Sequence, residues 1–449
     1  MRKSRYVVET EGPQGEPLLF NTANGAFVQL GEEGLAAWEH AVPDVEGVLE
    51  RFGFLTGLSA ADELEEQRAA FARQRADTTT MTLSFVPTYA CNYRCPYCYE
   101  LGHNKIPGKM DERMMDAIEA FVRERHDSNG FEALSVQWYG GDPSLALDVV
   151  QELTAKLVAF CDERGVAYDA MMLTNANVIG EKEAQIVADC RISSVFLTID
   201  GPEEIHNRRR VAANGSNSYE RTIRAARLFR EHGIRIMANM NADKVTLPLF
   251  ADLREKLLSE EGIDLSFGKL NDYGHFFGQA PFCAPDFDLF DHEEFFRAQF
   301  DEFAKRPHDA AELREMLLPP RRFCTGQADN YFVIDLLGDV YACDGWVGDR
   351  AHVTFNLLDD PSTWKLHEVS FDPTHDERCG ACALLPLCLG SCIWERTLSG
   401  MPCHPFKSTI GDYLRVYRDC LDVPPARAAV TVLAEGTVQA GTEGAPRDQ

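Results

Sequence analysis

The amino-acid sequence predicts an α/β protein: a partial (β/α)6 barrel, preceded by a winged-helix-like N-terminal domain and followed by a cysteine-rich C-terminal domain. Three observations lead to this prediction. Six apolar, strand-like runs lie between Thr82 and Leu270, with amphipathic helical segments between most of them. Residues 1–80 instead carry strand-like runs followed by short helical segments. Seven cysteines crowd into residues 324–403.

The N-terminal part is predicted from two kinds of segment. The runs RYVVET and LLFNTANGAFVQL have the composition of strands joined by a turn. The segments that begin at Gly31, Asp44 and Ala60 have helical periodicity. Strands followed by short helices predict a small winged fold over residues 1–80.

The central part repeats a strand followed by a helix. Its strand-like runs are TLSFVPTY, ALSVQWYG, AMMLTNA, SVFLTID, RIMANMN and DLSFGKL. Between the first two lies DERMMDAIEAFVRERH, in which Asp111 can cap a helix whose apolar face consists of Met114, Met115, Ile118, Phe121 and Val122. Repeated βα units predict parallel strands over residues 81–275, and a barrel of such units places its chemistry at the carboxyl ends of the strands.

The remaining residues divide into three segments. Residues 276–320 are rich in Phe and acidic residues and predict a helix-like connector. Residues 321–420 form the cysteine-rich domain. Residues 421–449 are rich in Ala, Gly, Pro, Thr and Glu and have too few large apolar side chains to pack, so a disordered tail is expected.

The charge balance excludes two kinds of partner. The chain of 449 residues has 44 Lys plus Arg against 71 Asp plus Glu, a formal net charge of −27. Nucleic-acid phosphates and anionic lipid repel such a chain, so neither a nucleic acid nor a membrane is expected as a partner. No apolar run approaches the roughly 20 residues of a membrane span, and the start MRKSRYVVETEG lacks the apolar core of a secretory signal. The expected location is the cytoplasm.

Fourteen cysteines in a cytoplasmic protein indicate metal binding or reactivity rather than disulfides. Three of them, Cys91, Cys95 and Cys98, follow the first barrel strand with the spacing Cys-x3-Cys-x2-Cys. A closed zinc site would need a fourth ligand nearby, whereas three thiolates on a four-iron cluster leave one iron open. A zinc knuckle or three core cysteines are the alternatives.

This motif closely resembles the signature of the radical S-adenosylmethionine (SAM) superfamily, in its spacing, in the aromatic Tyr97 before the last cysteine, and in its place after the first strand. The resemblance implies a [4Fe-4S] cluster whose open iron is chelated by SAM. It also implies reductive cleavage of SAM to a 5′-deoxyadenosyl radical, which abstracts hydrogen from a substrate. The cofactor supplies this chemistry and the protein supplies its placement.

The next two strands end in motifs with counterparts in that superfamily. The turn after the second strand resembles a glycine-glycine-glutamate-proline turn that meets the methionyl amino group of SAM, and its residues here are Gly140, Gly141, Asp142 and Pro143. Asp142 is shorter than glutamate, so the contact is expected mainly through carbonyls; an ordinary turn is the alternative. Thr174 and Asn175 close the third strand near the implied methionyl carboxylate or ribose, although Ala176 replaces the usual glycine.

The fourth and fifth strands add further polar groups. Asp200, with Arg210 after it, resembles the superfamily's block at the end of the fourth strand, and Asp200 either binds the ribose or shapes the turn. His206 is expected to be a structural hydrogen-bonding residue rather than a base. Asn239 and Asn241 interrupt an apolar run, and their amides serve either an internal network or the ribose.

The second cysteine set has the spacing Cys-x13-Gly-x4-Cys, then Cys-x2-Cys-x5-Cys-x3-Cys, then ten residues and a final cysteine. It looks like the SPASM domain, the auxiliary-cluster domain of enzymes that mature peptides and proteins. The resemblance implies two further [4Fe-4S] clusters, one held by Cys379, Cys382, Cys388 and Cys403 and the other by Cys324, Cys343 and Cys392. Cys283, Cys420, an aspartate or the substrate would complete the second cluster. Two structural zinc sites are the alternative.

Asp344 is the candidate catalytic residue. It directly follows Cys343 in the stretch VYACDGW, which resembles the anaerobic sulfatase-maturating enzymes, where an aspartate at this place takes the substrate proton. A solvated or helix-capping carboxylate is the alternative.

Together these resemblances predict a radical SAM oxidoreductase, a maturase that oxidatively cross-links a ribosomally made peptide. Residues 1–80 resemble the winged elements that hold leader peptides by adding a strand to a sheet edge, so a precursor peptide with a leader is the expected partner. An electron donor such as flavodoxin or ferredoxin is also expected. A formylglycine-forming sulfatase maturase and a non-catalytic metal-cluster scaffold that binds peptides are the alternatives.

Overall fold

The structure, a computed structural model, divides into two compact units that are each assembled from distant segments. Unit 1 comprises Met1–Arg75, Asp291–Cys324 and Ser370–Gln449, and unit 2 comprises Ala76–Phe290 and Thr325–Val369. The described residues are 1–98, 100, 106–271, 287–320, 324–366, 371–399, 403–421 and 429–436. Cys283 and most of the predicted tail lie outside them.

Unit 2 is built on a nine-stranded sheet with the order β11-β10-β9-β8-β7-β6-β12-β13-β14. Its six predicted strands are confirmed, and each pairs in parallel with its neighbours. They are β6 (Thr80–Val86), β7 (Ala133–Trp138), β8 (Ala167–Leu173), β9 (Ile192–Thr198), β10 (Arg235–Ala242) and β11 (Leu265–Lys269). The expected α/β partial barrel is therefore present.

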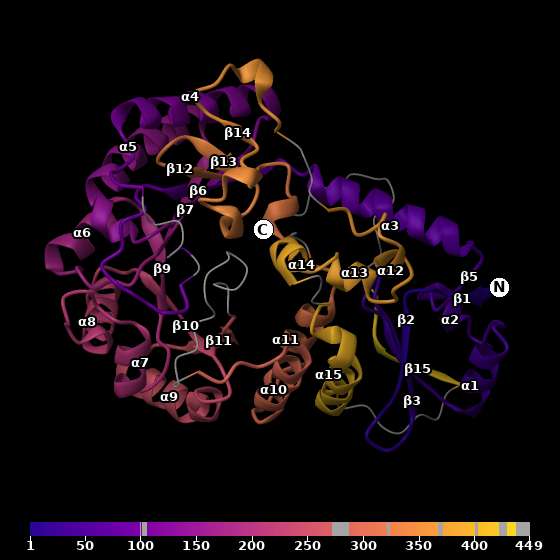
Figure 1. Cartoon of the computed structure of the whole chain (residues 1–449). Coiled ribbons are helices and arrows are strands. Elements are labelled where there is room, and N and C mark those ends of the chain that lie inside the picture. The colour runs from indigo at the N-terminus through magenta and orange to yellow at the C-terminus, as the bar shows by residue number, and fades with distance from the viewer. Residues whose placement is uncertain are drawn as a thin grey trace. The chain divides into compact units, whose positions relative to one another are not determined.

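Helices follow most of these strands and form an outer arc around them in Figure 1. They are α4 (Glu112–Asn129), α5 (Leu147–Arg164), α6 (Glu181–Asp189), α7 (Glu203–Arg209), α8 (Ser218–Glu231) and α9 (Phe250–Lys256). In α4 the Asp111 carboxylate accepts the backbone N–H of Met114, and the five predicted apolar residues are buried. The predicted cap and apolar face of this helix are confirmed.

The sequence reasoning missed three strands that extend the sheet beyond β6. They are β12 (Tyr331–Asp335), β13 (Asp339–Tyr341) and β14 (Phe355–Asn356), and β12 pairs in parallel with β6. All five residues of β12 are buried, so its run carries no strand-like alternation. Residues 325–369 therefore group with the barrel, whereas the sequence had assigned them to a separate domain that begins at residue 321.

An ion pair at the end of β10 is among the most deeply buried polar contacts of unit 2. The Arg209 guanidinium at the end of α7 lies 2.7 Å from Asp243 Oδ2, and their side chains are 1% and 0% exposed. The other carboxylate oxygen of Asp243 accepts the backbone N–H and the hydroxyl of Thr246, both at 2.9 Å. Because every part of this carboxylate has a partner, the pair fixes α7 against the end of β10.

Unit 1 contains a four-stranded antiparallel sheet with the order β15-β4-β3-β2 and a separate pair of β1 and β5. The strands are β1 (Arg2–Lys3), β2 (Val7–Glu11), β3 (Pro17–Asn21), β4 (Phe27–Leu30), β5 (Leu55–Thr56) and β15 (Val430–Ala434). The helices of the first 75 residues are α1 (Glu32–Glu39), α2 (Val48–Arg51) and α3 (Ala60–Arg75). They begin close to the three predicted positions.

The two faces of this sheet pack against two different hydrophobic cores, so alternate residues of its strands enter different cores. One face packs Leu19 and Val28 against α1, α2 and β5. The other packs Phe20 and Phe27 against helices from the last third of the chain. Those helices include α10 (His292–Ala304), α11 (Ala310–Leu317), α13 (Leu385–Cys388) and α15 (Phe406–Cys420). Unit 1 also contains α12 (Glu377–Gly380) and α14 (Ile393–Ser399).

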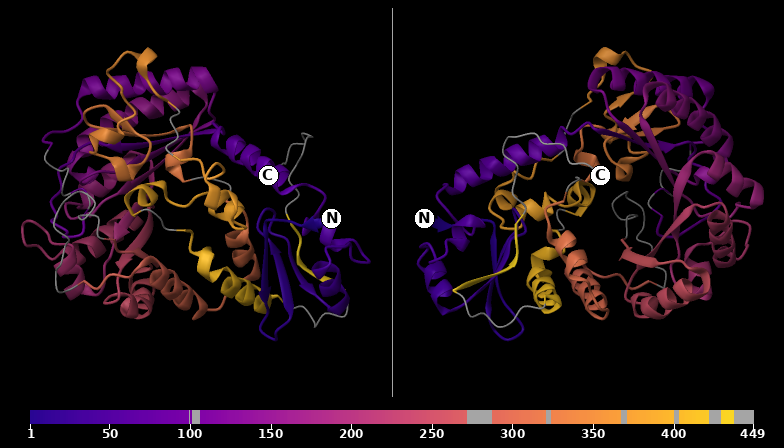
Figure 2. Two further views of the ribbon diagram at one scale, coloured as in Figure 1. Left: turned by 45° about the vertical axis from the view of Figure 1, so that its right-hand side comes forward. Right: turned by 180° about the vertical axis from the view of Figure 1, so that it is seen from behind.

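The prediction of a disordered tail is wrong for residues 430–434, because these residues form the strand β15. This strand, yellow beside the indigo strands in Figure 2, pairs antiparallel with β4. Its run VTVLA is short but β-branched, and the Val430 side chain is only 4% exposed. A composition average over the whole tail hid this local signal. In the part of the chain that the structure describes, no helix is long and apolar enough to cross a membrane.

The buried ion pair gives a prediction about stability. Asp243→Ala should lower the free energy of unfolding by about 3–5 kcal/mol, because it leaves the Arg209 guanidinium buried without its partner. Urea unfolding, followed by tryptophan fluorescence, measures this change. The double variant Arg209→Met with Asp243→Leu should recover most of the loss. Arg208→Ala on the exposed side of the same helix is the control. A single variant as stable as the wild type would contradict the account.

Candidate functional site

The three clustered cysteines lie together in the loop that follows β6. Cys91, Cys95 and Cys98 share one group of packed side chains, whose other members are Tyr93, Tyr97 and Ala212. Tyr93 and Ala212 form an antiparallel bridge, with a backbone hydrogen bond of 2.8 Å on each side of it. The loop is therefore anchored to the segment after α7, and its three cysteines belong to one packed group.

These thiols suit a metal cluster by their chemistry. Burial raises the pKa of each one, and that of Cys91 to about 11, so the loop by itself holds neutral thiols that a metal would deprotonate. Among the described residues, no group of three or more His, Cys, Asp or Glu side chains is arranged so that it could hold a metal ion. Three soft sulfur donors in one packed group fit an iron–sulfur cluster with one iron free of protein ligands.

The turn after β7 touches the start of this loop. A Cβ added to Gly141 would lie 2.4 Å from the carbonyl oxygen of Tyr89 and 2.5 Å from that of Ala90. Gly140 has φ +106°, which side chains rarely adopt. The backbone N–H of Asp142 donates to the carbonyl of Ala90 at 2.9 Å. Only glycines permit this approach, so the two glycines position the backbone that leads into Cys91.

The Asp142 carboxylate joins the second strand end to the third. Its Oδ1 accepts the hydroxyl of Thr174 at 2.7 Å and both the hydroxyl and the N–H of Ser144, while Oδ2 accepts the N–H of Asn175 at 3.2 Å. Asp142 is 1% exposed, and burial raises its pKa. Pro143 begins the short helix that follows. These internal bonds occupy a carboxylate that the sequence had assigned to a cofactor contact.

Asn175 connects the third strand end back to the cysteine loop. Its Nδ2 donates to Asn92 Oδ1 at 2.7 Å and lies 3.7 Å from the sulfur of Cys91. The next residue, Ala176, has φ +57°, a left-handed conformation that glycine adopts more readily. Asn175 therefore takes part in positioning Cys91, and Ala176 keeps the turn that a glycine would make.

A buried charged network links Tyr97 to the fourth strand end. The Tyr97 hydroxyl donates to Asp200 Oδ2, and Arg210 Nη1 donates to the Tyr97 oxygen at 3.2 Å. Burial raises the pKa of Asp200. Burial opposes the charge of Arg210, but Tyr97, Cys95 and Asp200 outweigh it and hold the pKa of Arg210 well above its ordinary value. Arg210 is therefore a fixed positive charge beside the thiols.

The fifth strand, β10, adds two amide side chains, one of which contacts Asp200. Asn241 donates to Asp200 Oδ1 through its backbone N–H at 2.9 Å and its side chain at 3.2 Å. Asn239 Oδ1 accepts the hydroxyl of Ser266 at 3.3 Å. His206 accepts the backbone N–H of Asp200 at 3.3 Å, and burial lowers the pKa of His206 well below its ordinary value. His206 is thus a neutral hydrogen-bond acceptor that shapes the turn.

Asp344 is held between two strands of unit 2. Ser84 on β6 donates to its Oδ1 and Tyr331 on β12 donates to its Oδ2, each at 2.7 Å. Burial raises the pKa of Asp344. Glu100 is 5% exposed, and burial, followed by repulsion from Asp344 and Asp142, raises its pKa to about 8. The sequence reasoning missed Ser84, Tyr331 and Glu100; an acid two residues beyond Cys98 was the available signal for the last.

The second cysteine set is split between the units. Cys379, Cys382, Cys388, Cys403, Cys324 and Cys392 belong to unit 1, and Cys343 belongs to unit 2. Burial raises the pKa of Cys388, and the nearby Cys403 and Cys382 add to this rise. Two cations reach the thiols: Arg396 donates to the Cys379 sulfur at 3.4 Å, and Lys407 donates to the Cys382 sulfur at 3.5 Å. Burial raises the pKa of Cys379 to about 11 although Arg396 opposes the rise, so a metal would have to deprotonate this thiol.

Known proteins resemble this chain in sequence and in fold. The radical SAM superfamily matches residues 85–244. The cysteine-type anaerobic sulfatase-maturating enzyme of Clostridium perfringens is 26% identical over 325 residues, which are 67% of this chain and 85% of that enzyme. The structure of anSMEcpe with bound AdoMet has a TM-score of 0.59 at 21% identity, over 75% of this chain and 99% of that one. SuiB of Streptococcus suis, bound to precursor peptide SuiA, has a TM-score of 0.50 at 17% identity, over 88% and 96%.

The matched segment contains the cysteine loop, the turn after β7 and the ends of β8, β9 and β10, which are the parts that meet at the site. The two solved structures share the fold over most of this chain. The chain therefore contains a domain of the radical SAM superfamily, at residues 85–244.

Proposed function

We propose that the protein cleaves SAM reductively and uses the resulting radical chemistry to cross-link a ribosomally made peptide. The observation that carries this proposal is the convergence of Cys91, Cys95 and Cys98 in one packed group at the carboxyl ends of parallel strands. A scaffold that only binds peptides would not need the polar groups that surround these thiols. The strand-end network therefore favours an enzyme.

In this proposal each strand end has a separate task. The three thiolates hold a [4Fe-4S] cluster, and the reduced cluster with bound SAM supplies hydrogen-atom abstraction. The carbonyls of Gly140 and Gly141 meet the methionyl amino group, and Thr174 and Asn175 approach the methionyl carboxylate or ribose. Arg210, Asp200, Tyr97 and Asn239 complete the surroundings of SAM. Asp142 acts by holding the second and third strand ends together.

The second cysteine set is proposed to hold two auxiliary [4Fe-4S] clusters. One takes Cys379, Cys382, Cys388 and Cys403, and it is supported by the two cations beside its thiols. The other takes Cys324, Cys343 and Cys392. Burial raises the pKa of Cys392, and the nearby Cys324 contributes to this rise. A flavodoxin or ferredoxin would deliver the electrons. The net charge of −27 favours a substrate with basic residues.

Two observations favour a precursor peptide as substrate. The complex of SuiB with its precursor peptide aligns over 88% of this chain, against 75% for anSMEcpe. The first 75 residues also supply β2, β3 and β4 of a four-stranded sheet, and a sheet edge is where an extended peptide can add a strand.

The second candidate function is formylglycine formation in a sulfatase. It is favoured by the relatedness to sulfatase-maturating enzymes over 67% of this chain and by Asp344, which begins the short helix after β13. Mass spectrometry of treated peptides separates the two functions. A cross-link removes two hydrogens and keeps every side-chain heavy atom, whereas formylglycine made from Cys exchanges the sulfur for a carbonyl oxygen. Formylglycine made from Ser also loses only two hydrogens, so its aldehyde is identified by the mass of its adduct with a hydrazide reagent.

The first prediction about function concerns iron. Anaerobically reconstituted protein should hold about twelve irons, because ten assigned thiolates serve three four-iron clusters. Replacing Cys91, Cys95 and Cys98 by Ala should remove about four irons and abolish formation of 5′-deoxyadenosine from SAM and dithionite. Cys161→Ala, at a buried cysteine on α5, is the control and should keep both. Unchanged cofactor cleavage in the triple variant would contradict the assignment.

Asp344 is the proposed base, because Ser84 and Tyr331 fix both of its oxygens one residue beyond a proposed cluster ligand. Asp344→Asn should keep the iron and the cleavage of SAM but form product about 10²–10⁴-fold more slowly. Ser84→Ala, which removes one hydrogen bond and keeps the carboxylate, is the matched control and should lose far less. Product formation at the wild-type rate in Asp344→Asn would leave Asp344 a structural residue.

A further inference from the structure

One edge of the N-terminal sheet is filled by a strand from the other end of the chain. β15 pairs antiparallel with β4, with Val430 opposite Leu30, Thr431 opposite Gln29 and Val432 opposite Val28. No other strand of the described chain pairs with β4 on that side. Roughly 400 residues separate the two strands, which is a large loop for a local sheet contact.

The edge of β4 is shaped to accept an extended backbone. The N–H of Gly31 donates to the carbonyl of Ala429 at 2.9 Å, just before β15. A Cβ added to Gly34 would lie 1.9 Å from that same carbonyl oxygen. Val430 enters the core formed with α1 and α2, and Leu433 enters the opposite core. The site therefore combines backbone hydrogen bonds with pockets for two apolar side chains.

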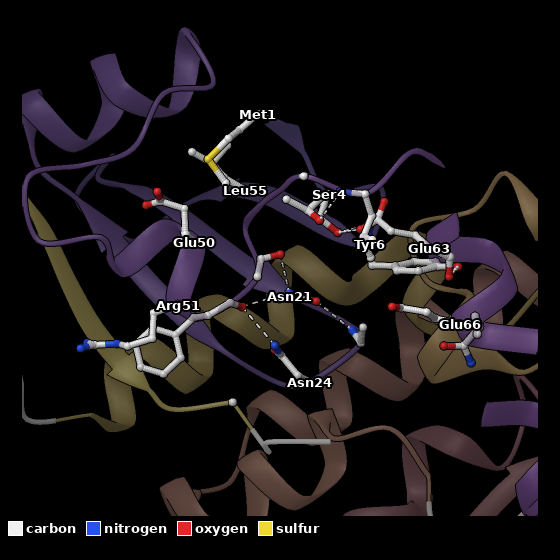
Figure 3. Close-up of a pocket in the computed structure, with 18 of the residues that line it drawn as sticks. Met1, Ser4, Tyr6, Asn21, Asn24, Glu50, Arg51, Leu55, Glu63 and Glu66 are labelled. Carbon is white, nitrogen blue, oxygen red and sulfur yellow. Dashed lines mark hydrogen bonds between the residues drawn. The ribbon is translucent and has the colours of Figure 1, made fainter. Parts of the chain in front are cut away.

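The strand leads directly into a pocket of about 790 Å³ in the same unit, shown in Figure 3. Glu435 and Gly436, the two residues after β15, line it, as do Glu50 and Glu66. Within the described chain, Glu50 Oε2 is buried and has no hydrogen-bond partner. β15 thus brings its own glutamate to a pocket that is already acidic.

Two cations near this pocket already have contacts. Glu63, a third acidic residue of the lining, pairs with Arg2 and accepts the hydroxyl of Ser4 at 2.6 Å. The Arg51 guanidinium lies over the Phe52 ring, 4.8 Å from its centre. A lysine or arginine side chain could lay its aliphatic stem along Leu55 and place its charge beside Glu50, whereas Glu66 lies on the other side of the pocket in Figure 3.

We propose that the β4 edge is the docking site for an extended apolar segment of the peptide substrate, followed by a basic residue that enters the pocket, and that β15 is an internal occupant which this segment displaces. The identity of the partner rests on the proposed function. The internal strand lowers the apparent affinity of every competing peptide, because a peptide can bind only during the fraction of time that the edge is open. It also adds selectivity, because a peptide with a basic residue in place of Glu435 has an advantage over β15.

The test uses two labelled peptides with the full chain, and no cluster or SAM is needed. The first has the sequence of residues 429–436, AVTVLAEG, and the second, AVTVLAKG, carries Lys at the place of Glu435. Val430→Asp would expel β15, since a buried unpaired carboxylate is costly, while every other element keeps its own residues. Fluorescence anisotropy should show both peptides binding to Val430→Asp at least about tenfold more tightly than to the wild type.

The matched control is Val8→Asp, the same change on β2 at the opposite edge of the sheet. It should bind the peptides no better than the wild type, and AVTVLAKG should bind to Val430→Asp more tightly than AVTVLAEG. Equal binding to the wild type and Val430→Asp would overturn the proposal. Unfolding of Val430→Asp in a thermal melt would also overturn it, because a displaceable strand must leave a folded sheet behind.

The outcome for this edge is distinguishable from the outcome for the proposed function. Hydrogen exchange at residues 430–434 should increase when AVTVLAKG is added to the wild-type chain, and unchanged exchange with the peptide bound would place it elsewhere. If the edge opens and binds these peptides but a precursor peptide that the enzyme modifies does not compete with them, the docking proposal fails and the maturase function stands. If a precursor peptide competes at the edge but no peptide is modified in the presence of SAM and a reductant, the docking edge stands and the maturase function fails.

Discussion

Close contact between two backbone segments holds the cysteine loop in position, and the rest of the site is arranged around it. At Gly141 an added Cβ would lie 2.4 Å from the carbonyl oxygen of Tyr89, so the turn after β7 lies directly against the residues before Cys91. Asp142 then binds the end of β8 through Thr174 and Asn175, and Asn175 returns to Asn92 beside Cys91. Three strand ends thus form one continuous ring of contacts, which fixes the thiols without any metal.

Much of the barrel could be predicted because its signals are local. Alternation and apolar runs locate β6 to β11, and the spacing of the cysteines marks the two segments that are proposed to bind metal. The strand β12 could not be predicted in this way, because it depends on pairing with β6, hundreds of residues away. The strand β15 has a local β-branched run, but the composition of the whole tail hid it, and its partner β4 is also distant in sequence. The same long-range pairing divides the chain into units that do not follow its sequence order.

The site residues show the same division between local and distant information. Sequence motifs single out Asp142 and Asp200, but only the structure shows their contacts. Asp142 joins two strand ends, and Asp200 accepts hydrogen bonds from Tyr97 and Asn241. Ser84 and Tyr331 have no motif, since they matter only through Asp344. The expectation that His206 is a structural hydrogen-bonding residue is supported, because its ring accepts a backbone N–H and burial keeps the ring neutral.

The central claim is that the loop of Cys91, Cys95 and Cys98 holds a cluster with one iron open to SAM. Electron–nuclear double resonance of the reduced, reconstituted protein with SAM labelled by ¹⁷O in its carboxylate tests this claim most directly. The account predicts a hyperfine coupling between the label and the cluster. A spectrum that SAM leaves unchanged, or native protein that contains zinc in place of iron, would contradict it.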